Sequence, residues 1–563
     1  MKRTAYLFFA ALLLAATLSA QDRVVERTYV ATDRDVYVAG DIMWYSAFCL
    51  DAERGTFSPV SSVAYVELHD DAAMVASGKV ALYGGRGAGR LAIPGGLPTG
   101  NYRLVAYTAQ NGAETGYDYN GIASKVISVF NVFSGDRVKD GVEVVTDEEY
   151  GKMADVMSGS APASRGLSVT EAGDGLVLVN ESGEAATLCL SVVHDDGFLP
   201  NGNPTIADFT AGCGKVVRRS FDNSIIPEYE GEIIRGHVTG FSQEMMSKLV
   251  GCFAFISTPS DKSEVYSSVI DENGKVEFFT GNIYGTKEYI CEIEGIDPSL
   301  NCFIELESPY VGAKVAPAEP LRIASLLREP LLERSVAMQV ERRFTGDTLL
   351  DPLPVVKGGL FNDEDITYIL DDYTRFTTMQ EVFVEFVQEM RTRRREDGSP
   401  DIQVKLSDAS EYTWSKGRSL MLLDGVPVFD HQKILDYDPL LVESIHIYPH
   451  TYYIGTRTFE GVVNFVTYRH NLPGFSFGGN VRVIDYQGVS VPMAFTGEAL
   501  RSEEGYPDYR QTIYWHPLLE LAPGQKMVIP LKMPDYKGRF KVSAEGLTAG
   551  GRPLGAQTSV ESR

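Results

Sequence analysis

This sequence lacks several residue patterns on which enzymes and metal proteins depend. None of its eight histidines belongs to a His-Glu-x-x-His motif, and no Gly-Lys pair is followed by Ser or Thr as in a phosphate-binding loop. Cysteine is scarce, and no two cysteines have the short spacing of a zinc or redox site. The six are Cys49, Cys189, Cys213, Cys252, Cys291 and Cys302. We therefore expect no catalytic, cofactor-binding or metal-binding residues, and we expect that the protein is not an enzyme.

Positive charge and long hydrophobic runs are also in short supply. The chain has 51 lysines and arginines against 76 aspartates and glutamates, which gives a formal net charge of −25. Because nucleic-acid binding requires a basic surface, nucleic acid is not an expected partner. Beyond the N-terminus, no stretch supplies the roughly 20 apolar residues that a membrane-spanning helix needs. We expect no transmembrane span in the mature chain.

The N-terminus has the features of a secretory signal peptide, which we assign to residues 1–20. Lys2 and Arg3 precede an apolar run at residues 5–14, and small residues ending at Ala20 follow. This order is typical of an exported protein, and the run is shorter than a membrane span. We expect cleavage after Ala20 and a periplasmic location associated with the outer membrane. An uncleaved N-terminal anchor is the alternative.

An exported location leaves the state of the cysteines open. Such compartments permit disulfides, and Cys291 and Cys302 are the closest pair in the sequence. Six cysteines nevertheless allow fifteen connectivities. Most of them also lie in apolar, strand-like surroundings, where buried free thiols are common. The sequence is compatible with disulfides and with buried free thiols.

Most of the chain has the pattern of short β-strands. Between residues 27 and 130, runs such as 36–38 and 43–48 alternate in polarity and are separated by Gly, Pro and Asp. Strands at such regular spacing favour a β-sandwich. Similar runs recur at residues 166–217 and 229–279. The predicted fold class is mainly β, with several immunoglobulin-like sandwich domains.

The clearest helix signal begins at residue 379. Five apolar residues recur on one helical face, and Thr377 or Thr378 can cap the start. The five are Met379, Phe383, Phe386, Val387 and Met390. Four arginines then crowd the predicted C-terminal end, where a helix favours cations; these are Arg391, Arg393, Arg394 and Arg395. We interpret them as a solvated helix terminus, with a contact to anionic lipid head groups as the alternative.

One segment near the N-terminus resembles the second domain of alpha-2-macroglobulin-type proteins. That family has an Asp-x-x-x-Tyr-x-x-Gly-(Asp/Glu) stretch followed by a strand of alternating aromatics. The matching residues here are Asp33, Tyr37, Gly40, Asp41, Trp44 and Phe48, with a closing hairpin at residues 97–106. The resemblance implies a sandwich in which Tyr37 and Trp44 fill the space between the sheets. The family's thioester requires Cys-Gly-x-Gln, and Cys213 is followed by Gly, Lys and Val, which excludes covalent trapping of a protease.

A later segment resembles the plug of TonB-dependent receptors. It reads as a strand with an Asp-Gly turn at residues 420–428, a Glu-Ser-Ile strand at 442–447, a Tyr and Gly at 453–455 and a Gly-Val-Val strand at 461–466. His450 and Thr451 depart from the family pattern, and Ile454 separates the Tyr from the Gly. Too few residues follow His470 for a barrel. Prolines also interrupt them, among them Pro507, Pro517, Pro523, Pro530 and Pro534. We predict a small α+β plug-like domain without a transmembrane barrel.

Two weaker resemblances complete the predicted domain map. Residues 229–284 are similar to carboxypeptidase regulatory-like domains, and residues 508–547 again resemble a macroglobulin module. The map has a signal peptide (1–20), a macroglobulin-like sandwich (21–132), a second sandwich (133–220), a regulatory-like domain (221–318), a helical linker (319–355), a plug-like domain (356–472) and a C-terminal macroglobulin-like domain (473–563). This combination resembles exported envelope proteins of Bacteroidetes.

Two groups of histidines deserve separate interpretation. His446 and His450 have i,i+4 spacing, but Pro449 prevents the helix that would bring both to one metal ion. His194 is followed by two aspartates and a glycine, which favours a polar turn at the end of a strand over carboxylate–histidine chemistry. We predict structural roles for all of these side chains.

Two loops have an acidic or glycine-rich pattern. The glycine-rich stretch at residues 84–89 lies between strands and has no helix after it, so we interpret it as a flexible turn rather than a phosphate site. The segment at residues 271–274 ends in Asn-Gly, which indicates a hairpin turn; a calcium site there is the weaker alternative.

These features together predict a binding protein. We expect a non-enzymatic envelope protein that binds another periplasmic or outer-membrane protein through its β-sandwich and plug-like modules. One alternative is a macroglobulin-like protein that binds or inhibits peptidases noncovalently. Another is an accessory of TonB-dependent nutrient import, whose partner would be an outer-membrane receptor.

Overall fold

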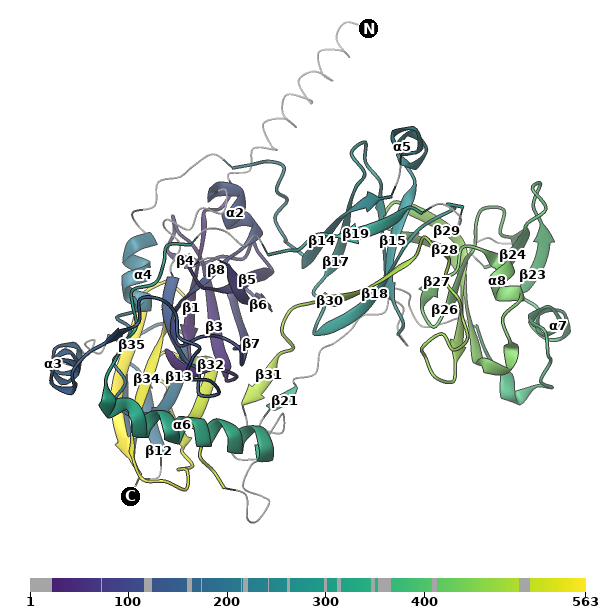
Figure 1. The fold of residues 1–563 in the computed structure, drawn as a ribbon. Coiled ribbons are helices and arrows are strands. Elements are labelled where there is room, and N and C mark those ends of the chain that lie inside the picture. The colour runs from purple at the N-terminus through teal and green to yellow at the C-terminus, as the bar shows by residue number, and fades with distance from the viewer. Residues whose placement is uncertain are drawn as a thin grey trace, which may run out of the picture. The chain divides into compact units, whose positions relative to one another are not determined.

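The computed structural model is mainly β and divides into two compact units (Figure 1). Unit 1 consists of residues 1–231, 310–354 and 489–563, and unit 2 consists of residues 232–309 and 355–488. The structure describes residues 23–71, 73–115, 124–158, 165–173, 175–213, 215, 221–240, 242–260, 264–297, 301–310, 315–345, 350–352, 366–407, 413–495 and 507–562. The predicted signal peptide lies outside these residues. Within them, no helix is both long and apolar enough to cross a membrane.

The first sandwich of unit 1 is built from nine strands in two sheets. One sheet contains β1 (Glu26–Thr32), β3 (Ile42–Asp51), β4 (Thr56–Phe57) and β7 (Arg86–Ala92). The other has the order β2 (Val36–Val38), β9 (Ser124–Phe130), β8 (Gly100–Tyr107), β5 (Val63–His69) and β6 (Met74–Ala81). Apolar side chains from both sheets form one core, which includes three fully buried tyrosines, Tyr37, Tyr45 and Tyr102.

In this sandwich, the predicted position of Trp44 and the predicted flexible turn at residues 84–89 both differ from the structure. Tyr37 lies between the sheets as predicted, but Trp44 does not. Because successive strand residues point to opposite faces, Tyr45 points into this core, and Trp44 packs against a separate cluster outside it. The glycine-rich stretch is also not a flexible turn throughout, since Gly87 and Gly89 lie within β7. A Cβ on Gly89 would lie 2.5 Å from the Tyr45 hydroxyl, so glycine permits this close packing.

The second sandwich of unit 1 combines segments from distant parts of the chain. One sheet has the order β11 (Leu167–Ala172), β12 (Gly175–Asn180) and β33 (Lys526–Pro530). The other has the order β32 (Thr512–Leu521), β13 (Ala186–His194), β34 (Arg539–Thr548) and β35 (Pro553–Glu561). The predicted domains 133–220 and 473–563 are therefore not separate. β13 is central and largely buried, so its backbone requires a partner on both sides, and both partners come from the C-terminal segment.

Helices and short strand pairs complete unit 1. The helices are α2 (Ala109–Thr115), α3 (Asp147–Ser158), α4 (Ile206–Cys213) and α6 (Arg328–Val340), with a 3-10 turn at Ser325–Leu327 and a π-helical turn at Glu341–Thr345. The short pairs are β10 (Glu143–Val144) with β20 (Arg322–Ile323), and β21 (Leu350–Pro352) with β31 (Met493–Phe495). The helical linker predicted at residues 319–355 thus contains α6.

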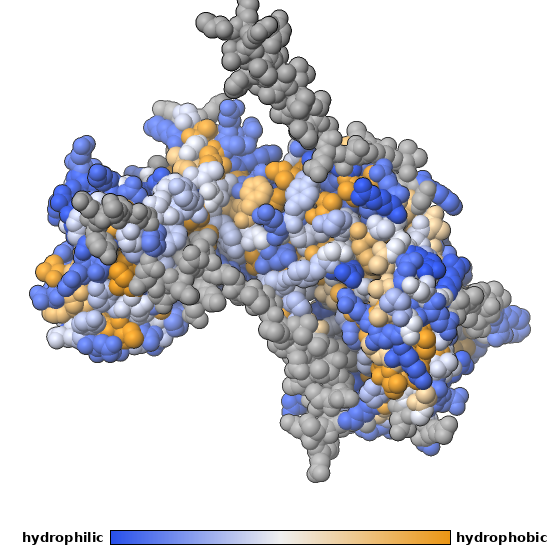
Figure 2. Space-filling view, turned by 180° about the vertical axis from the view of Figure 1, so that it is seen from behind, coloured by the Kyte–Doolittle hydropathy of each residue, from blue (hydrophilic) through white to orange (hydrophobic). Residues whose placement is uncertain are grey.

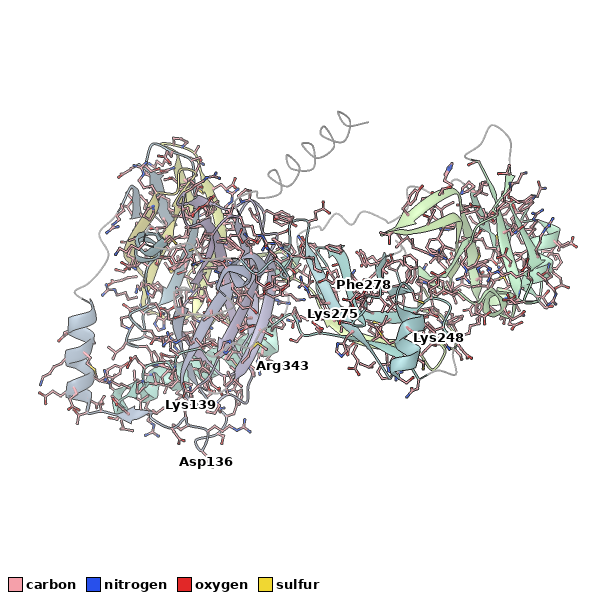
Figure 3. All side chains as sticks on the ribbon, turned by 90° about the horizontal axis from the view of Figure 1, so that it is seen from above. Asp136, Lys139, Lys248, Lys275, Phe278 and Arg343 are labelled. Carbon is pink, nitrogen blue, oxygen red and sulfur yellow. The ribbon has the colours of Figure 1, made fainter. Side chains whose placement is uncertain are left out.

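Unit 2 contains a third sandwich. One sheet has the order β17 (Lys275–Gly281), β14 (Glu232–Thr239) and β19 (Phe303–Leu306). The other has the order β16 (Glu264–Val269), β15 (Phe253–Thr258), β18 (Thr286–Ile293) and β30 (Arg482–Gln487). The helix α5 (Gln243–Leu249) follows β14. Phe278, labelled in Figure 3, lies in the core between the sheets. The predicted turn at residues 271–274 is present, with the Gly274 N–H donating to the Asp271 carbonyl. The strands that it joins, β16 and β17, pair in different sheets, so it is not a hairpin.

The remainder of unit 2 is an α+β region. Its main sheet has the order β22 (Ile366–Ile369), β28 (Val442–Ile454), β29 (Arg457–Thr467), β26 (Leu420–Leu423), β27 (Val426–Pro427). A smaller sheet has the order β23 (Met390–Arg394), β24 (Pro400–Leu406), β25 (Thr413–Trp414). The helices are α7 (Met379–Glu385) and α8 (His431–Leu435), with 3-10 turns at Leu370–Asp372 and Pro439–Leu441.

The predicted helix in this region is shorter than its apolar spacing suggests. Thr378 caps it as expected, accepting a hydrogen bond from the Glu381 N–H. The helix ends at Glu385 because Phe386 has φ −144°, outside the helical region. The arginines at 391, 393 and 394 consequently lie on strand β23. Their interpretation as a solvated helix terminus is wrong.

Candidate functional site

The aspartate of the macroglobulin-type motif is a buried hydrogen-bond acceptor in unit 1. Asp33 Oδ1 accepts from the Tyr37 hydroxyl at 2.7 Å and from the Trp44 N–H at 3.0 Å. Its Oδ2 accepts from the Thr512 hydroxyl at 2.7 Å. Burial raises the pKa of Asp33, against the opposing influence of Arg34 and these hydrogen bonds. The motif therefore ties the first sandwich to β32 of the second, which is a structural role.

The Asp-Gly turn of the α+β region has a similar role. Asp424 is 1% exposed and has φ 49°, a left-handed conformation that Asp tolerates better than most residues. Its carboxylate accepts from the Thr467 N–H and hydroxyl and from the Leu472 N–H, each at 2.7 Å. Gly425 donates its N–H to Asn464 Oδ1 at 2.9 Å. This turn fixes the ends of β26 and β29 and presents no group to solvent.

A buried carboxylate–histidine pair, which sequence reasoning missed, lies in the first sandwich. His69 Nε2 lies 2.6 Å from Glu67 Oε2, and the Tyr107 hydroxyl donates to Glu67 Oε1 at 2.6 Å. The i,i+2 spacing on strand β5 places both side chains on one face and was the available signal. Glu67 and His69 are 0% and 3% exposed. Such burial leaves no access for a substrate, so the pair stabilises the sheet.

The histidines considered in the sequence analysis have separate partners. His446 Nε2 lies 2.9 Å from Ser444 Oγ, and His450 Nδ1 lies 3.3 Å from Ser407 Oγ. Both lie on strand β28. His194 ends β13 and packs edge-on against Tyr536. Across the described ranges, no group of three His, Cys, Asp or Glu side chains is arranged to hold a metal ion.

The acidic residues after His194 include one that is buried in an ion pair. Asp196 accepts from Arg334 of α6 through two hydrogen bonds, at 2.5 and 2.9 Å. Arg334 also donates to the Val36 carbonyl and lies over the Phe198 ring at 4.5 Å. The segment following His194 thus anchors α6 within unit 1. No local sequence pattern indicates this contact, because its two partners, Asp196 and Arg334, are far apart in the chain.

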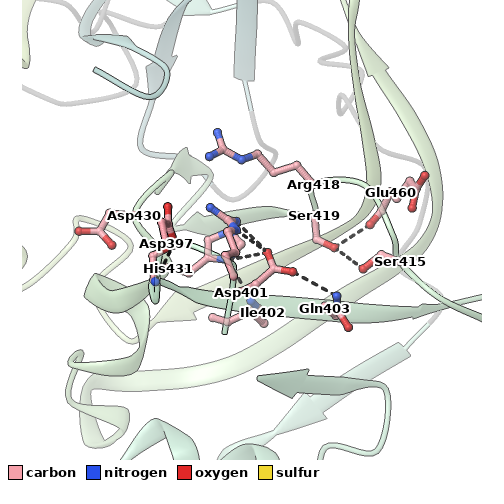
Figure 4. A network of polar contacts seen from close by, with 12 residues as sticks. Asp397, Asp401, Ile402, Gln403, Ser415, Arg418, Ser419, Asp430, His431 and Glu460 are labelled. Carbon is pink, nitrogen blue, oxygen red and sulfur yellow. Dashed lines mark hydrogen bonds and ion pairs between the residues drawn. The ribbon is translucent and has the colours of Figure 1, made fainter. Parts of the chain in front are cut away.

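A polar network surrounds His431 in the α+β region (Figure 4). His431 Nδ1 accepts from the Ile402 N–H at 3.0 Å, so this nitrogen carries no proton. Burial lowers the pKa of His431 to about 4. Next to it, Asp401 accepts from Arg395 at 2.7 Å. The histidine is therefore neutral at physiological pH. Its side chain is 3% exposed, and its hydrogen bond joins α8 to β24.

The basic cluster is partly paired. The Arg391 guanidinium lies over the Trp414 ring at 4.2 Å, and its Nε donates to Gln403. Arg395 is bonded to Asp401, and Arg394 donates to the Gly398 carbonyl. These contacts stiffen the β23–β24 hairpin, and among them the one between Arg395 and Asp401 pairs a guanidinium with a carboxylate.

Sequence reasoning also missed a Gly-x-Ser-x-Gly spacing at residues 474–478. In a hydrolase this spacing marks a nucleophile on a sharp strand-to-helix turn. Here the five residues form an irregular segment after β29, with no helix following them. Ser476 offers its carbonyl to Lys433, and Phe475 and Phe477 pack on the core of the α+β region. The segment is a packed loop rather than a nucleophile elbow.

The six cysteines are free thiols, and five of them are buried. Cys291 and Cys302 both lie in the core of the third sandwich and are not linked. Burial raises the pKa of Cys291 to about 12. The thiol is therefore protonated and unreactive at neutral pH.

Exposed sheet edges and aromatic rings are the features most suited to binding. β30 forms one edge of its sheet, and Val483 on it is 54% exposed. In the α+β region, the rings of Tyr373 and Phe386 stack at 4.3 Å with an interplanar angle of 3°, and Tyr373 is 41% exposed. On the face shown in Figure 2, hydrophobic residues are interspersed with hydrophilic ones.

Comparisons with known proteins give only distant likenesses. No protein-family model matches the chain, and no curated protein matches it. Among solved structures, it is similar to Escherichia coli alpha-2-macroglobulin activated by porcine elastase, with 9% identity, TM-score 0.24 and coverage of 95% of this chain and 43% of that one. Salmonella alpha-2-macroglobulin reacted with methylamine gives 9% identity, TM-score 0.23 and coverage of 95% and 39%.

Dimeric latent PorU from Porphyromonas gingivalis gives 10% identity, TM-score 0.14 and coverage of 51% of this chain and 33% of that one. The chain spans about two fifths of the length of the two macroglobulins. At these TM-scores, the likeness neither assigns the chain to a family nor transfers a property to it.

Proposed function

We propose that this chain is a non-enzymatic protein of the bacterial envelope that binds another envelope protein by accepting an extended segment at a sheet edge. The observation that carries the proposal is the position of β30. This strand pairs with β18, although β18 ends at Ile293 and β30 begins at Arg482. The sheet thus ends in a strand that a distant segment supplies, and strand addition by a partner would extend it by one more strand at this edge.

The outer edge of β30 has the properties that strand addition requires. Within the described ranges, no strand pairs with this edge. β30 has six residues and contains no proline, so its backbone can continue a hydrogen-bonded ladder. Val483, Asp485 and Gln487 are exposed on one face, while Tyr486 is buried on the other. An incoming segment would therefore meet an ordered strand with one side chain face already anchored.

Site-specific photo-crosslinking tests this proposal. The full chain, produced in bacterial cells, would carry a photoreactive residue in place of Val483. A matched control would carry it in place of Val144, which is 80% exposed on the short strand β10 of unit 1. We expect one adduct of defined mass at position 483 and none at 144. The absence of an adduct at 483, or equal adducts at both positions, would contradict the proposal.

Noncovalent binding of peptidases is a second candidate. The observation that favours it is the ordered Asp33 motif, which resembles that of macroglobulin-type proteins and joins two sandwiches in unit 1. A panel of serine, cysteine and metallopeptidases incubated with the purified chain distinguishes the two. Slowed cleavage of a protein substrate, or co-elution with a peptidase, would support this candidate.

A further inference from the structure

Four aromatic side chains gather on the α+β region, and we call them the aromatic platform: Tyr368, Tyr373, Phe376 and Phe386. Tyr373 and Phe386 stack face to face with centroids 4.3 Å apart. Phe376 lies 6.3 Å from Phe386, and Tyr368 lies 6.1 Å from both Tyr373 and Phe386. The rings come from the end of β22, the loop after it and the C-terminal end of α7. The four rings thus form one cluster, of which Tyr373 is the most exposed member.

The platform is held firmly and is open on one side. Phe376, Phe386 and Tyr368 are partly buried against the core of the α+β region, and the Tyr368 hydroxyl donates to Glu389. Tyr373 is 41% exposed. Because one ring face of Tyr373 is covered by Phe386, its exposure belongs to the other face and the ring edge. A ligand that stacks there would meet a preorganised ring and pay little conformational entropy.

A polar group lies next to the platform in the sequence. Asp371 lies on the 3-10 turn two residues before Tyr373. Its Oδ1 accepts from Arg375 at 3.2 Å, and its Oδ2 accepts from the Tyr468 hydroxyl at 2.6 Å. Arg375 also donates to the carbonyls of Pro439 and Val442. The Asp371 side chain remains 60% exposed, and Tyr468 is 46% exposed.

The charge of this rim restricts the class of ligand. The carboxylate of Asp371 is balanced by the Arg375 guanidinium, so the pair offers no net charge to a cation or an anion. The chain as a whole has a formal net charge of −25, which disfavours acidic ligands. What remains is an electron-rich ring face beside hydrogen-bonding groups, with the exposed carboxylate of Asp372 on the same turn as a further reason why an anionic ligand is disfavoured. A pyranose ring matches this arrangement, because its C–H bonds cover one face and its hydroxyls surround the rim.

We propose that the aromatic platform binds a neutral oligosaccharide, with one sugar ring stacked on Tyr373 and its hydroxyls hydrogen-bonded to Asp371 and Tyr468. This site lies in the α+β region and is distinct from the β30 edge of the proposed function. It requires no charged substituent on the sugar. Binding should therefore change little between low and high salt.

Affinity electrophoresis of the full chain tests the proposal. The gels would contain a neutral β-glucan, a neutral α-glucan or a mannan, and polygalacturonate would serve as the anionic comparison. We expect at least one neutral polysaccharide to retard the chain. Tyr373→Ala should weaken that binding at least tenfold, whereas Tyr373→Trp should preserve it.

Two further variants separate recognition from folding. Tyr453 is 70% exposed on β28 of the same unit and provides the matched control, so Tyr453→Ala should leave retardation unchanged. Asp371→Asn should weaken binding severalfold while the unfolding transition stays in place. The proposal is overturned if none of the neutral polysaccharides retards the wild-type chain, if only polygalacturonate does, or if Tyr373→Ala binds as well as Tyr453→Ala. None of these results depends on crosslinking at Val483, so the two proposals can fail independently.

Discussion

Two buried aspartates, one in each unit, show two different ways of closing a β-rich fold. Asp33 and Asp424 are 3% and 1% exposed, and each accepts three hydrogen bonds. The partners of Asp424 lie within the next fifty residues, at Thr467 and Leu472. Asp33 instead receives a bond from Thr512, which is 479 residues away. The α+β region is thus closed by nearby segments, whereas unit 1 depends on contacts between the two ends of its chain.

The largest expected effect comes from removing the local acceptor. Asp424→Ala leaves two backbone N–H groups and a hydroxyl without a partner and puts alanine in a left-handed conformation. We expect a loss of about 4 kcal/mol in unfolding free energy, measured by urea denaturation. Hydrogen exchange followed by mass spectrometry should localise the loss to unit 2. Asp424→Asn keeps one acceptor oxygen and should lose about half as much; equal losses for the two variants would contradict this account.

A pH titration of stability tests the same region through His431. Its pKa is lowered to about 4 in the folded state, against about 6.5 in an unfolded chain. The stabilisation is therefore complete above pH 6.5 and is lost as the pH falls towards 4, by up to about 3 kcal/mol. His431→Asn can still accept from the Ile402 N–H but does not titrate. Its unfolding free energy should lack this slope, and an unchanged slope would show that another group is responsible.

A smaller effect is expected when the hydrogen bond between Thr512 and Asp33 in unit 1 is removed. Thr512→Val keeps the shape of the side chain but removes the hydroxyl that donates to Asp33. We expect a loss of about 1.5 kcal/mol, with faster hydrogen exchange in both β2–β3 and β32. Thr512→Ser keeps the hydroxyl and should lose less. If exchange increased in β32 alone, Asp33 would not link the two sandwiches as described.

The smallest expected effect concerns the cap of α7, which lies beside the aromatic platform. Thr378 accepts from the Glu381 N–H, and its hydroxyl donates to the Glu381 carboxylate at 2.8 Å. Thr378→Ala should cost about 1 kcal/mol, and Thr378→Ser should cost much less. Thermal unfolding measures both. Similar melting temperatures for Thr378→Ala and the wild type would show that packing alone holds this short helix.

Local features of this molecule were predictable from its sequence, and distant pairings were not. The Thr378 cap and the Asp424–Gly425 turn follow from neighbouring residues, and the position of Tyr37 between sheets follows from the resemblance of its motif to macroglobulin-type proteins. The pairing of β13 with β32 and β34, and of β18 with β30, joins segments hundreds of residues apart, and alternation of polarity does not specify which strands meet. This is why the C-terminal segment was predicted as a separate domain.

The candidate binding surface was harder to predict for a related reason. Phe386 matches the apolar face of the predicted helix, but the chain leaves the helical conformation at that residue and its ring stacks on Tyr373. Tyr373 lies in irregular structure, where periodicity carries no information. Nothing in the local sequence indicates that these two rings are coplanar.

The strand order of the second sandwich has a consequence for how the chain is made. β13 emerges from the ribosome long before β34, since His194 pairs with Phe540. At synthesis rates of roughly 5–20 residues per second, β13 waits on the order of tens of seconds for its partner. During that interval its apolar, hydrogen-bond-deficient edges are open to aggregation. A chaperone that binds extended apolar segments would protect β13 in the nascent chain. All of unit 2 is synthesised before β34 becomes available to pair with β13.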